Sequence, residues 1–570
     1  MTKFRLSASI LSFLLAFSIL GCTAKNSEIS TESPVFIPEN VNIWQKYDEP
    51  VDLNLCVPAS DITWPGAVTG DYSYENNVWT RAWKEDLGIN AKVKWEALDA
   101  TGSYETRLNL AIVSGDLPDI IVTKTFSQFS KLQAAGKLQD IAPYMDAYGS
   151  DLFKSNLKKS PDKTTNTVIG NKLYGLSLGG NDYRTRLIYI RNDWMKKLGL
   201  SAPKSMDDVI NIGKKFVDAG LAKYALPLYG QVINGMGDIV AVANSMGAYP
   251  RIWIEDGKGN LKYGSIQPEI RDTLKLYSDL VRGGYVDKAF SSINSGTLAS
   301  QITMGYIGVL PSDYWMISWP LNSMWGDADE KWQKQVDWEI YPVMPMSTLK
   351  DEMKIQGGQT SSGVVCVNKD YKNPEVLFKV INFALQKLEN PKTAELSVFH
   401  SKTMDDKTYQ FFNMSPLYLM FNDPMENYDT QKNVTAAIDN GFDKSYLKTA
   451  HDKLQYTPIR EMFLGKESGI KMSTTQWVAY KSFYGSSSAF AIYNDYISKN
   501  MYQFDKITGY QSSTMTRVWS SMLDEEDRAF MKIMSGKEPI EFFDSFVAQW
   551  RAMGGDQITN EINEWYKAKS

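Results

Sequence analysis

Histidine is almost missing from this sequence, which contains only His400 and His451. No His-Glu-x-x-His motif is present, and no group of histidine and cysteine has the spacing of zinc ligands. The sequence therefore predicts no zinc centre. A pair of carboxylates acting as the acid and base of a glycosidase stays open, because the spacing that matters there is spatial and not sequential.

Clusters of lysine and arginine are also missing, and the 570 residues carry a formal net charge of −5. A protein that binds nucleic acid usually concentrates basic residues on one face, so nucleic acid is not an expected partner. The composition, with 43% hydrophobic and 22% charged residues, is that of an ordinary globular protein. The length is too great for one hydrophobic core and predicts two large domains.

The most apolar stretch near the start, residues 10–20, is too short to span a bilayer. With Lys3 and Arg5 before it, residues 1–21 are expected to be a secretory leader. The end of the leader and the residue after it, Ile19-Leu-Gly-Cys22, resemble a lipobox, so we expect Cys22 to be lipidated as the first residue of the mature protein and to hold it on the extracytoplasmic face of the cell membrane. A plain signal peptide with an incidental cysteine is the alternative. Residues 22–45, rich in Ser, Thr, Glu and Pro, read as a flexible tether.

Only two further cysteines exist, Cys56 and Cys366, each inside an apolar strand-like run. A disulfide in an oxidising compartment and two buried free thiols both fit this pattern. No bond is predicted.

Strand and helix patterns alternate after the tether. Residues 51–58 and 91–97 alternate like strands, residues 119–123 read as a buried parallel strand, and helical spacing lies between them. This is the pattern of a doubly wound sheet, in which ligands bind beyond the carboxyl ends of the strands. Trp64, in a Pro/Gly loop, and Thr123 and Thr125 are expected at that edge, whereas Trp79, Trp83 and Trp95 are assigned to the core.

A second α/β unit begins at residues 171–200. A Gly-rich loop, where unusual backbone angles cost little, leads to the polar residues 181–184, a short strand at 187–190 and a helix. Asp193 is the expected N-cap of that helix, and Gly199 its C-terminal glycine. We interpret this stretch as the first crossing between two lobes.

These residues resemble the first interlobe crossing of the extracellular solute-binding proteins of family 1, the carbohydrate-binding subunits of ABC importers. The matching residues are Lys172-Leu-Tyr-Gly175, Tyr189-Ile-Arg-Asn-Asp-Trp194 and Leu198-Gly-Leu200. Residues 114–121, 268–287 and 554–566 also match the family pattern. The matching motifs occur in the same order as in the family, and the resemblance covers nearly the whole mature chain. The subgroup that it resembles most is that of the large lipoproteins similar to alginate-oligosaccharide-binding proteins.

The resemblance implies an α/β fold of the two-lobed, type II periplasmic-binding-protein kind. Each lobe is expected to be a sheet flanked by helices, with three crossings and a helical C-terminal part. Lobe 1 is expected to comprise residues 46–186 and 357–405, and lobe 2 residues 187–356 and 406–570. The Gly-rich residues 357–363 would form the second crossing; they lack the Gly-Lys-Ser/Thr ending of a phosphate-binding loop. The third crossing is expected between about His400 and Met420.

In the second lobe, residues 224–229 and 304–309 are expected to be strands. The second of these leads into Trp315, where the family has an aromatic residue that stacks on a sugar ring; Tyr314 and Trp319 compete with it. Several relatives carry a calcium loop near residues 216–229, but this sequence has no run of Asp and Asn there. Residues 256–260 read as a hairpin turn with too few carboxylates for calcium, so neither a metal nor another cofactor is expected.

The resemblance implies binding and not catalysis. We expect a monomer that captures an oligosaccharide between its lobes and delivers it to the permease of an ABC importer. A peptide- or signal-binding protein of the same fold and an extracellular carbohydrate-active enzyme are the alternatives. Arg186 is expected either to face a uronate or to pair with Asp182, and residues 181–186 are alternatively hinge residues. The predicted ligand contacts are Trp64, Thr123, Thr125, Asn181, Asp182, Tyr183, Arg186, Tyr229, Asp313, Trp315, Gln359 and Tyr484.

Overall fold

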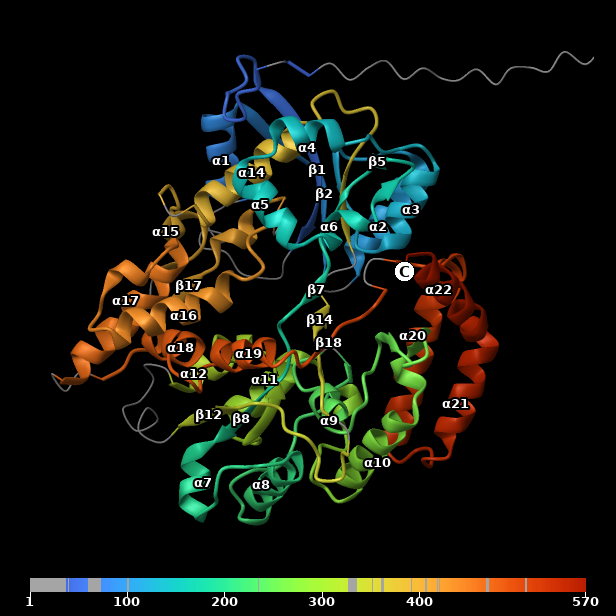
Figure 1. The fold of residues 1–570 in the computed structure, drawn as a ribbon, viewed down its shortest axis with the longest axis vertical. Coiled ribbons are helices and arrows are strands. Elements are labelled where there is room, and N and C mark those ends of the chain that lie inside the picture. Colours follow the sequence, from blue (N-terminus) through green and yellow to red (C-terminus); the bar gives the residue numbers. More distant parts are fainter. Residues whose placement is uncertain are drawn as a thin grey trace, which may run out of the picture. The chain divides into compact units, whose positions relative to one another are not determined.

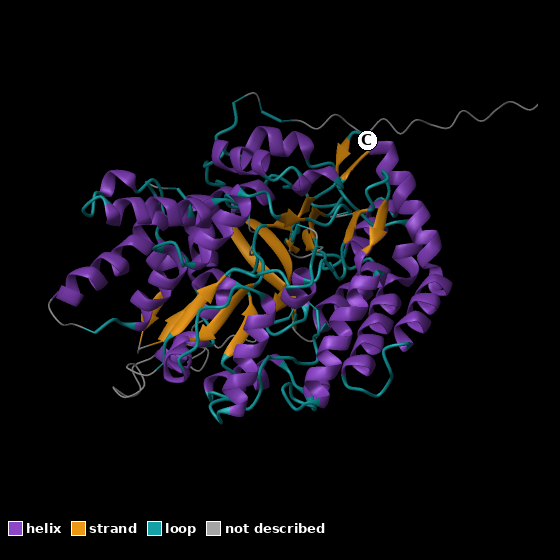
Figure 2. Cartoon of the chain, turned by 60° about the horizontal axis from the view of Figure 1, so that its bottom comes forward, coloured by secondary structure: helices purple, strands orange, loops and turns teal. Residues whose placement is uncertain are grey.

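The computed structural model describes residues 37–38, 40–59, 73–99, 102–233, 235–325, 336–350, 352–359, 363–390, 392–404, 407–417, 419, 421–467, 471–507 and 510–569. The lipidation site predicted at Cys22 and the ligand contact predicted at Trp64 lie outside these residues. Residues 40–570 form one compact unit. It is built on two separate main sheets, and helices surround the strands (Figure 2).

The sheet of the first lobe has five strands in the order β2-β1-β3-β15-β6. β1 is parallel to β2 and β3, whereas β15 is antiparallel to β3 and β6, so a segment from far along the chain returns to complete the sheet (Figure 1). The three strands predicted near the start are confirmed. The strands are β1 (Val51–Ala59), β2 (Ile89–Leu98), β3 (Ile120–Val122), β6 (Leu176–Ser177) and β15 (Val364–Val367).

Three helices on the first sheet, α1, α3 and α5, begin at a residue whose side chain caps the helix, namely Asn77, Thr125 and Ser150. Asn77 accepts hydrogen bonds from the backbone N–H groups of Trp79 (2.9 Å) and Thr80 (3.3 Å), which the helix itself leaves unpaired. The elements are α1 (Val78–Ala82), η1 (Trp83–Leu87), α2 (Ser103–Ser114), α3 (Phe126–Ala134), α4 (Ala142–Tyr148), α5 (Asp151–Lys159), α6 (Asp162–Thr165), α14 (Val376–Leu388), α15 (Leu396–Phe399) and η5 (Phe411–Met414), with the hairpins β4 (Val168–Ile169) with β5 (Lys172–Leu173) and β16 (Lys402–Met404) with β17 (Lys407–Tyr409).

The sheet of the second lobe is smaller and antiparallel, in the order β11-β8-β12. Its strands are β8 (Leu187–Arg191), β11 (Val309–Ser312) and β12 (Trp338–Tyr341). The elements before residue 326 are α7 (Asn192–Leu198), α8 (Met206–Asp218), α9 (Val240–Ser245), β9 (Trp253–Glu255), β10 (Leu261–Tyr263), η2 (Gly264–Ile266), α10 (Pro268–Arg282), η3 (Phe290–Ser292), α11 (Ser295–Thr303), η4 (Tyr314–Ile317) and α12 (Leu321–Trp325).

The C-terminal part is mostly helical, as predicted. Its elements are α16 (Glu426–Asp439), η6 (Lys444–Tyr446), α17 (Ala450–Glu467), α18 (Thr474–Phe483), α19 (Ala489–Ser498), β18 (Tyr502–Gln503), α20 (Ser513–Met534), α21 (Phe542–Trp550), η7 (Arg551–Gly555) and α22 (Asp556–Lys569). Phe530, Phe546 and Trp550 are buried in the same hydrophobic cluster as Ile188 of β8. This helical part therefore belongs to the core of the second lobe.

Three local predictions in the second lobe were wrong. Residues 224–229 form no strand but only an isolated bridge between Tyr224 and Ile307, because Pro227 lacks the N–H that a ladder needs. The strand predicted at 304–309 begins only at Val309, since Gly305 takes a positive φ of 75° in the turn after α11. The N-cap of α7 is Arg191 and not Asp193, which pairs with that arginine from the first helical turn.

The segments that connect the two sheets run side by side. In the first of them β7 (Asn181–Asp182) pairs antiparallel with β14 (Gly358–Gln359) of the second, so that Asn181 lies opposite Gln359. β13 (Ile355–Gln356) pairs with β18, which brings the C-terminal part to the same place. The last described residue in the buried cluster around Leu53 is Phe421. After it, the next buried residue in the cluster around Ile188 is Tyr428.

Candidate ligand-binding site

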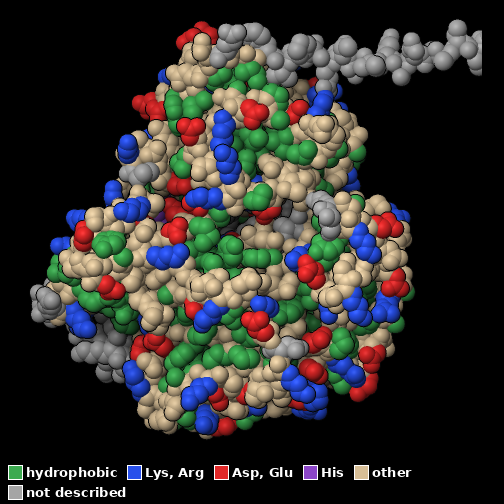
Figure 3. Space-filling view, viewed as in Figure 1, with side chains coloured by type: hydrophobic (Ala, Val, Ile, Leu, Met, Phe, Trp, Pro, Cys, Tyr) green, Lys and Arg blue, Asp and Glu red, His purple; other side chains and the backbone are tan. Residues whose placement is uncertain are grey.

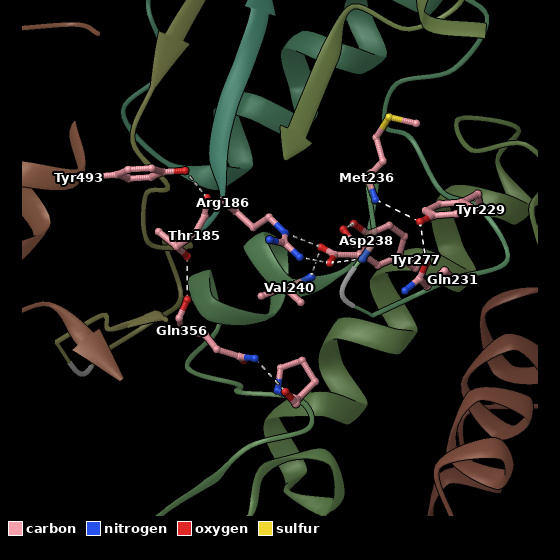
Figure 4. Close-up of polar contacts among 12 residues, drawn as sticks. Thr185, Arg186, Tyr229, Gln231, Met236, Asp238, Val240, Tyr277, Gln356 and Tyr493 are labelled. Carbon is pink, nitrogen blue, oxygen red and sulfur yellow. Dashed lines mark hydrogen bonds and ion pairs between the residues drawn. The ribbon is translucent and has the colours of Figure 1, made fainter. Parts of the chain in front are cut away.

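The first crossing ends in a buried ion pair at the start of β8. The Arg186 guanidinium donates from Nε to Asp238 Oδ1 (3.1 Å) and from Nη2 to Asp238 Oδ2 (2.5 Å), as Figure 4 shows. Asp238 also accepts hydrogen bonds from the backbone N–H groups of Gly235 (3.0 Å) and Val240 (3.1 Å). The two-pronged geometry holds the guanidinium plane in one orientation. Arg186 thus has a carboxylate partner, but not the Asp182 considered in the sequence analysis.

Asp182 pairs instead with Arg184, two residues along the chain. Arg184 donates from Nε to Asp182 Oδ2 (2.5 Å) and from its backbone N–H to Asp182 Oδ1 (2.8 Å). Burial alone would lower the pKa of the Arg184 guanidinium, but Asp182, Tyr314 and Asp313 together raise it above its ordinary value.

Asp313 lies at the carboxyl end of β11, beside this crossing. Its Oδ1 accepts hydrogen bonds from the backbone N–H of Tyr314 (2.6 Å) and from the Tyr493 hydroxyl (3.3 Å). Burial raises the pKa of the Asp313 carboxyl, and the positive charges of Arg186 and Arg184 oppose that shift. The side chain is thus a fixed acceptor within the field of two guanidinium groups.

Two tryptophans follow at once on η4 and the residues after it. The Trp315 and Trp319 rings stack with centroids 6.2 Å apart and planes inclined by 20°. Trp319 is 47% exposed, and Trp315 is partly buried. Tyr314, the third candidate, packs against Phe490 at 4.8 Å and so belongs to the interior. A stacked indole pair at the end of a strand offers a flat apolar surface of the kind that a sugar ring covers.

Tyr183 lies among other aromatic rings. Its ring has edge-to-face contacts with Tyr428 (6.0 Å), Tyr502 (5.0 Å) and Phe504 (5.2 Å). Tyr502 donates its hydroxyl hydrogen to the Tyr183 carbonyl (2.6 Å). One residue of the first crossing is thus packed against both the start of α16 and the segment around β18. This packing favours the alternative prediction, in which residues 181–186 are hinge residues.

The threonines predicted as contacts are held inside the first lobe. Thr123 is fully buried and exchanges hydrogen bonds with the backbone of Val364, its Oγ1 accepting at 2.9 Å and donating at 3.2 Å. Thr125 is the N-cap of α3 and accepts from the Gln128 N–H at 3.3 Å. Both side chains thus have structural partners in the described structure.

Two tyrosines and two amides complete the predicted set. Tyr229 is buried and donates to Gln231 Oε1 (3.0 Å) while accepting from the Met236 N–H (3.2 Å), as Figure 4 shows. Tyr484 lies at the end of α18 and donates to Asp439 Oδ1 (2.7 Å). Asn181 is exposed and donates from Nδ2 to the Asp505 carbonyl (3.3 Å). Gln359 is placed opposite Asn181 by its backbone pairing alone.

Other residues that build the site were not predicted. Asp238 and Tyr493 bind the first crossing from elements 52 and 308 residues away in the sequence. Tyr493 donates its hydroxyl hydrogen to the Thr185 carbonyl (2.5 Å). Nothing in the local pattern around Tyr493 distinguishes it from a helix core residue. The Gly-Met-Gly run before Asp238 is a loop signal, and an acidic residue there is a helix-capping signal.

The letters Gly-x-Ser-x-Gly of a nucleophile elbow occur at residues 175–179. An elbow holds its serine exposed on a sharp turn between a strand and a helix. Ser177 instead lies buried in β6, where its hydroxyl donates to the Gly179 carbonyl (3.3 Å), and the chain continues into β7. Ser177 is therefore placed as a sheet residue and not as a nucleophile.

The described part of the chain has neither a cluster of metal ligands nor a disulfide. No group of three or more His, Cys, Asp or Glu residues there is placed to hold a metal ion. Cys56 and Cys366 are both buried free thiols, and burial raises the pKa of Cys56 to about 12. Residues 256–260 form the predicted hairpin turn between β9 and β10, with Asp256 Oδ1 accepting from the N–H groups of Lys258 and Asn260.

No described helix is long and apolar enough to cross a membrane. Acidic and basic side chains are interspersed on the face drawn in Figure 3.

Carboxyl groups are crowded around residues 421–428, where Glu389, Asp423 and Glu426 interact. Asn156 of α5 donates from Nδ2 to both oxygens of Glu389 (3.1 and 2.9 Å). Burial, together with the charge of Asp423, raises the pKa of Glu389 to about 7, although the Asn156 hydrogen bonds oppose the shift. Burial and the charge of Glu389 raise the pKa of Glu426 to about 8.

This cluster predicts that folding stability depends on pH. Because both folded-state pKa values exceed 4.5, the ordinary value of a glutamate carboxyl, the folded chain binds more protons than the unfolded chain between about pH 4.5 and 8. The free energy of unfolding should therefore fall as the pH rises through that window, by up to about 1.4 kcal/mol per pH unit for each proton. Urea denaturation at several pH values measures the slope. Glu426→Gln should flatten it, whereas Glu352→Gln, at a 75% exposed side chain, should not; an unchanged slope in Glu426→Gln would refute the assignment.

Two sheet-centred lobes joined by hydrogen-bonded crossings, with aromatic and polar side chains at the junction, define the class of two-lobed binding proteins. The chain belongs to the family of bacterial extracellular solute-binding proteins, whose sequence profile matches residues 66–387. This confirms the family and the fold class predicted from the sequence, and the family consists of binding proteins.

Relatives of known sequence are similar over different lengths. Lipoprotein LipO of Bacillus subtilis (strain 168) is 28% identical over 248 residues, which are 40% of this chain and 45% of LipO. The polygalacturonan/rhamnogalacturonan-binding protein YtcQ of the same organism is 25% identical over 478 residues, which are 81% of this chain and 83% of YtcQ. The match thus spans less than half of LipO and most of YtcQ.

Solved structures show the same fold. The alginate-binding protein AlgQ2, in its form without calcium ion, matches with a TM-score of 0.59 and 14% identity, over 91% of this chain and 99% of that chain. FusA of S. pneumoniae, a substrate-binding protein of an ABC transporter solved in complex with kestose, matches with a TM-score of 0.59 and 13% identity over the same shares. The fold class is therefore that of a two-lobed solute-binding protein.

Proposed function

We propose that this protein captures an oligosaccharide between its two lobes and delivers it to the permease of an ABC importer. The stacked pair of Trp315 and Trp319, at the end of β11 and next to the Asp313 carboxylate, carries this proposal. An aromatic surface covers the apolar face of a sugar ring, and an adjoining carboxylate accepts hydrogen bonds from its hydroxyls. The relatives YtcQ, named as a polygalacturonan/rhamnogalacturonan-binding protein, and FusA, named as a fructooligosaccharide-binding subunit of an ABC transporter, support the choice of a sugar.

The mechanism is capture without turnover. Lobes joined by short crossings close on a ligand by bending at those crossings, and closure buries the ligand between them. Each sugar hydroxyl buried in this way needs a partner, because an unpaired buried polar group costs about 1–3 kcal/mol. The packing around Tyr183 gives such a joint a defined position. Specificity then comes from the match between hydroxyls and fixed polar side chains.

The lobes are proposed to meet at the crossings described above. Lobe 1 comprises residues 46–186 and continues from residue 357, and lobe 2 comprises residues 187–356 and the C-terminal part. Because Phe411, Leu417 and Phe421 pack in the cluster of the first lobe, we place the third crossing between residues 421 and 428, later than the sequence pattern indicated.

The same proposal assigns the predicted contact residues either to direct contact with the ligand or to positioning of the site. Asp313 and Trp315 contact the ligand, with Asn181, Asp182 and Gln359 at the rim; Trp64, outside the described residues, is kept as a contact on its sequence alone. Thr123, Thr125, Tyr183, Arg186 and Tyr229 position the site through the partners described above. Tyr484 is the weakest member of the set, since its hydroxyl is engaged by Asp439.

The test is the melting temperature of the protein without residues 1–21, against neutral oligosaccharides, uronate oligosaccharides and peptides. A ligand that binds only the folded form raises the melting temperature by mass action. A rise with one sugar class, and an unchanged ligand on chromatography afterwards, is the expected result. A rise with peptides alone, or conversion of a sugar to a product, would instead identify the peptide-binding or enzymatic alternative.

We propose further that Cys22 carries the lipid that holds a monomeric protein on the extracytoplasmic face of the cell membrane. The Leu20-Gly-Cys22 sequence after an apolar run supports this, and a relative bears the name lipoprotein. Metabolic labelling with palmitate should mark the wild type, and Cys22→Ala should be unlabelled and released from the membrane fraction. Labelling of Cys22→Ala would place the lipid elsewhere.

A further inference from the structure

The charged side chains at the first crossing form one cluster with an excess of negative charge. Two guanidinium groups, Arg184 and Arg186, lie within the electrostatic reach of three carboxylates, Asp182, Asp238 and Asp313. We call these five residues the crossing cluster. The neighbouring pair of Lys163 and Asp162 adds one charge of each sign and leaves the excess unchanged.

Both guanidinium groups of the crossing cluster already have carboxylate partners. Asp238 is fully buried and binds Arg186 through two hydrogen bonds, so the pair can separate only by leaving a charge without a partner in the interior. Arg184 is held by the side chain of Asp182. Arg186 is therefore not free to form the two-pronged contact that binds a sugar carboxylate, and the charge of Arg184 is balanced by its pair with Asp182.

The third carboxylate of the crossing cluster has spare capacity. The Asp313 side chain accepts two hydrogen bonds from described residues, one from the Tyr314 N–H and one from the Tyr493 hydroxyl. Both are accepted by Oδ1. Its Oδ2 accepts none from the described residues. A carboxylate oxygen with open lone pairs binds hydroxyl groups and repels other carboxylates.

Four stretches of sequence outside the described residues add no net positive charge. Residues 60–72, 100–101 and 360–362, the undescribed stretches that follow strand β1, strand β2 and crossing strand β14, contain no lysine or arginine. The undescribed residues 326–335, between the second and third strands of the small sheet, contain two lysines against three acidic residues.

We infer that the crossing cluster makes this protein selective for uncharged oligosaccharides and excludes uronates, with Asp313 as the specificity-determining residue. The inference rests on the proposed function, since it assumes that a sugar binds at the junction of the lobes. It separates this chain in specificity from YtcQ, which is named as a polygalacturonan-binding protein. An uncompensated like charge a few ångströms away in a partly buried site weakens binding by about tenfold or more.

Calorimetric titration at pH 7 with pairs of trisaccharides that differ only in the C6 carboxylate tests this selectivity. The probes are galactotriose against trigalacturonate and mannotriose against trimannuronate, with kestose as a further neutral sugar. We expect the neutral member of a pair to bind at least about tenfold more tightly. Asp313→Asn keeps a side chain that caps the turn of η4, and it should raise the affinity for the uronate relative to its neutral partner by about tenfold. Asp279→Asn, a matched removal of one surface charge on α10, should leave that ratio unchanged.

The outcomes separate the inference from the proposed function. A wild-type protein that binds a uronate as tightly as its neutral partner, or an Asp313→Asn protein with an unchanged ratio, overturns the charge selectivity while sugar binding stands. Binding of peptides and of no sugar overturns the proposed function itself.

Discussion

Replacing Trp315 with alanine is expected to weaken oligosaccharide binding about 30-fold or more while the protein stays folded. Buried tryptophans at binding sites typically contribute at least about 2 kcal/mol, which corresponds to that factor. The substitution removes one ring of the stacked pair and leaves Trp319, already 47% exposed, without its neighbour. A flat apolar face is thereby lost beside the carboxylate that orients the sugar. Calorimetric titration with the oligosaccharide found in the melting-temperature test measures the dissociation constant.

Two further variants show whether the loss is local. Trp319→Ala should weaken binding in the same direction, because the two rings form one surface. Trp44→Ala removes a tryptophan that is 40% exposed and lies before the first strand, and it should leave the dissociation constant unchanged. An unchanged affinity in Trp315→Ala, with a normal circular dichroism spectrum, would show that the sugar does not rest on this pair.

The sequence predicted the path of the backbone better than the partners of its side chains. The strand at residues 187–190 and the helix that ends at Gly199 follow from local rules, since an apolar run forms a buried strand and glycine adopts the positive φ of 64° that ends the helix. The strand predicted at residues 224–229 was wrong because the prediction rested on the apolar residues of this stretch and neglected Pro227, which a β-ladder cannot accommodate.

Side-chain partners at the site depend on contacts across long stretches of sequence. Arg186 carries a charge that any carboxylate can neutralise, and a nearby Asp182 was a reasonable choice from the sequence. Only the fold shows that the loop before α9 brings Asp238 to that guanidinium, while Arg184 occupies Asp182. Tyr183 gives the same lesson, because a tyrosine in a polar stretch predicts a ligand contact until Tyr428 and Tyr502 surround it. Sequence periodicity reports on neighbours in the same element and not on neighbours brought by the fold.

The largest stability effect is expected from Asp238→Ala, which should lower the free energy of unfolding of the second lobe by about 3–5 kcal/mol. Removing this carboxylate leaves the Arg186 charge buried without its partner, and it also deprives the N–H groups of Gly235 and Val240 of their acceptor. Urea denaturation, followed by the fluorescence of the buried Trp338 and its neighbours, measures the loss. Asp279→Asn serves as the control, because it removes an exposed carboxylate from α10 of the same lobe.

The double variant Arg186→Met with Asp238→Ala decides why the carboxylate matters. If the main cost is an unpaired buried charge, removing the arginine as well should recover a large part of the lost stability, since apolar replacements of buried ion pairs are often neutral. If the cost comes mainly from the loop before α9, the double variant should be as unstable as Asp238→Ala alone, because Gly235 and Val240 still lack their acceptor. A single variant with wild-type stability would contradict both explanations and the structural role given to Arg186. Since the same pair occupies the guanidinium that a uronate would need, its strength also sets how firmly charged sugars are excluded from the junction of the lobes.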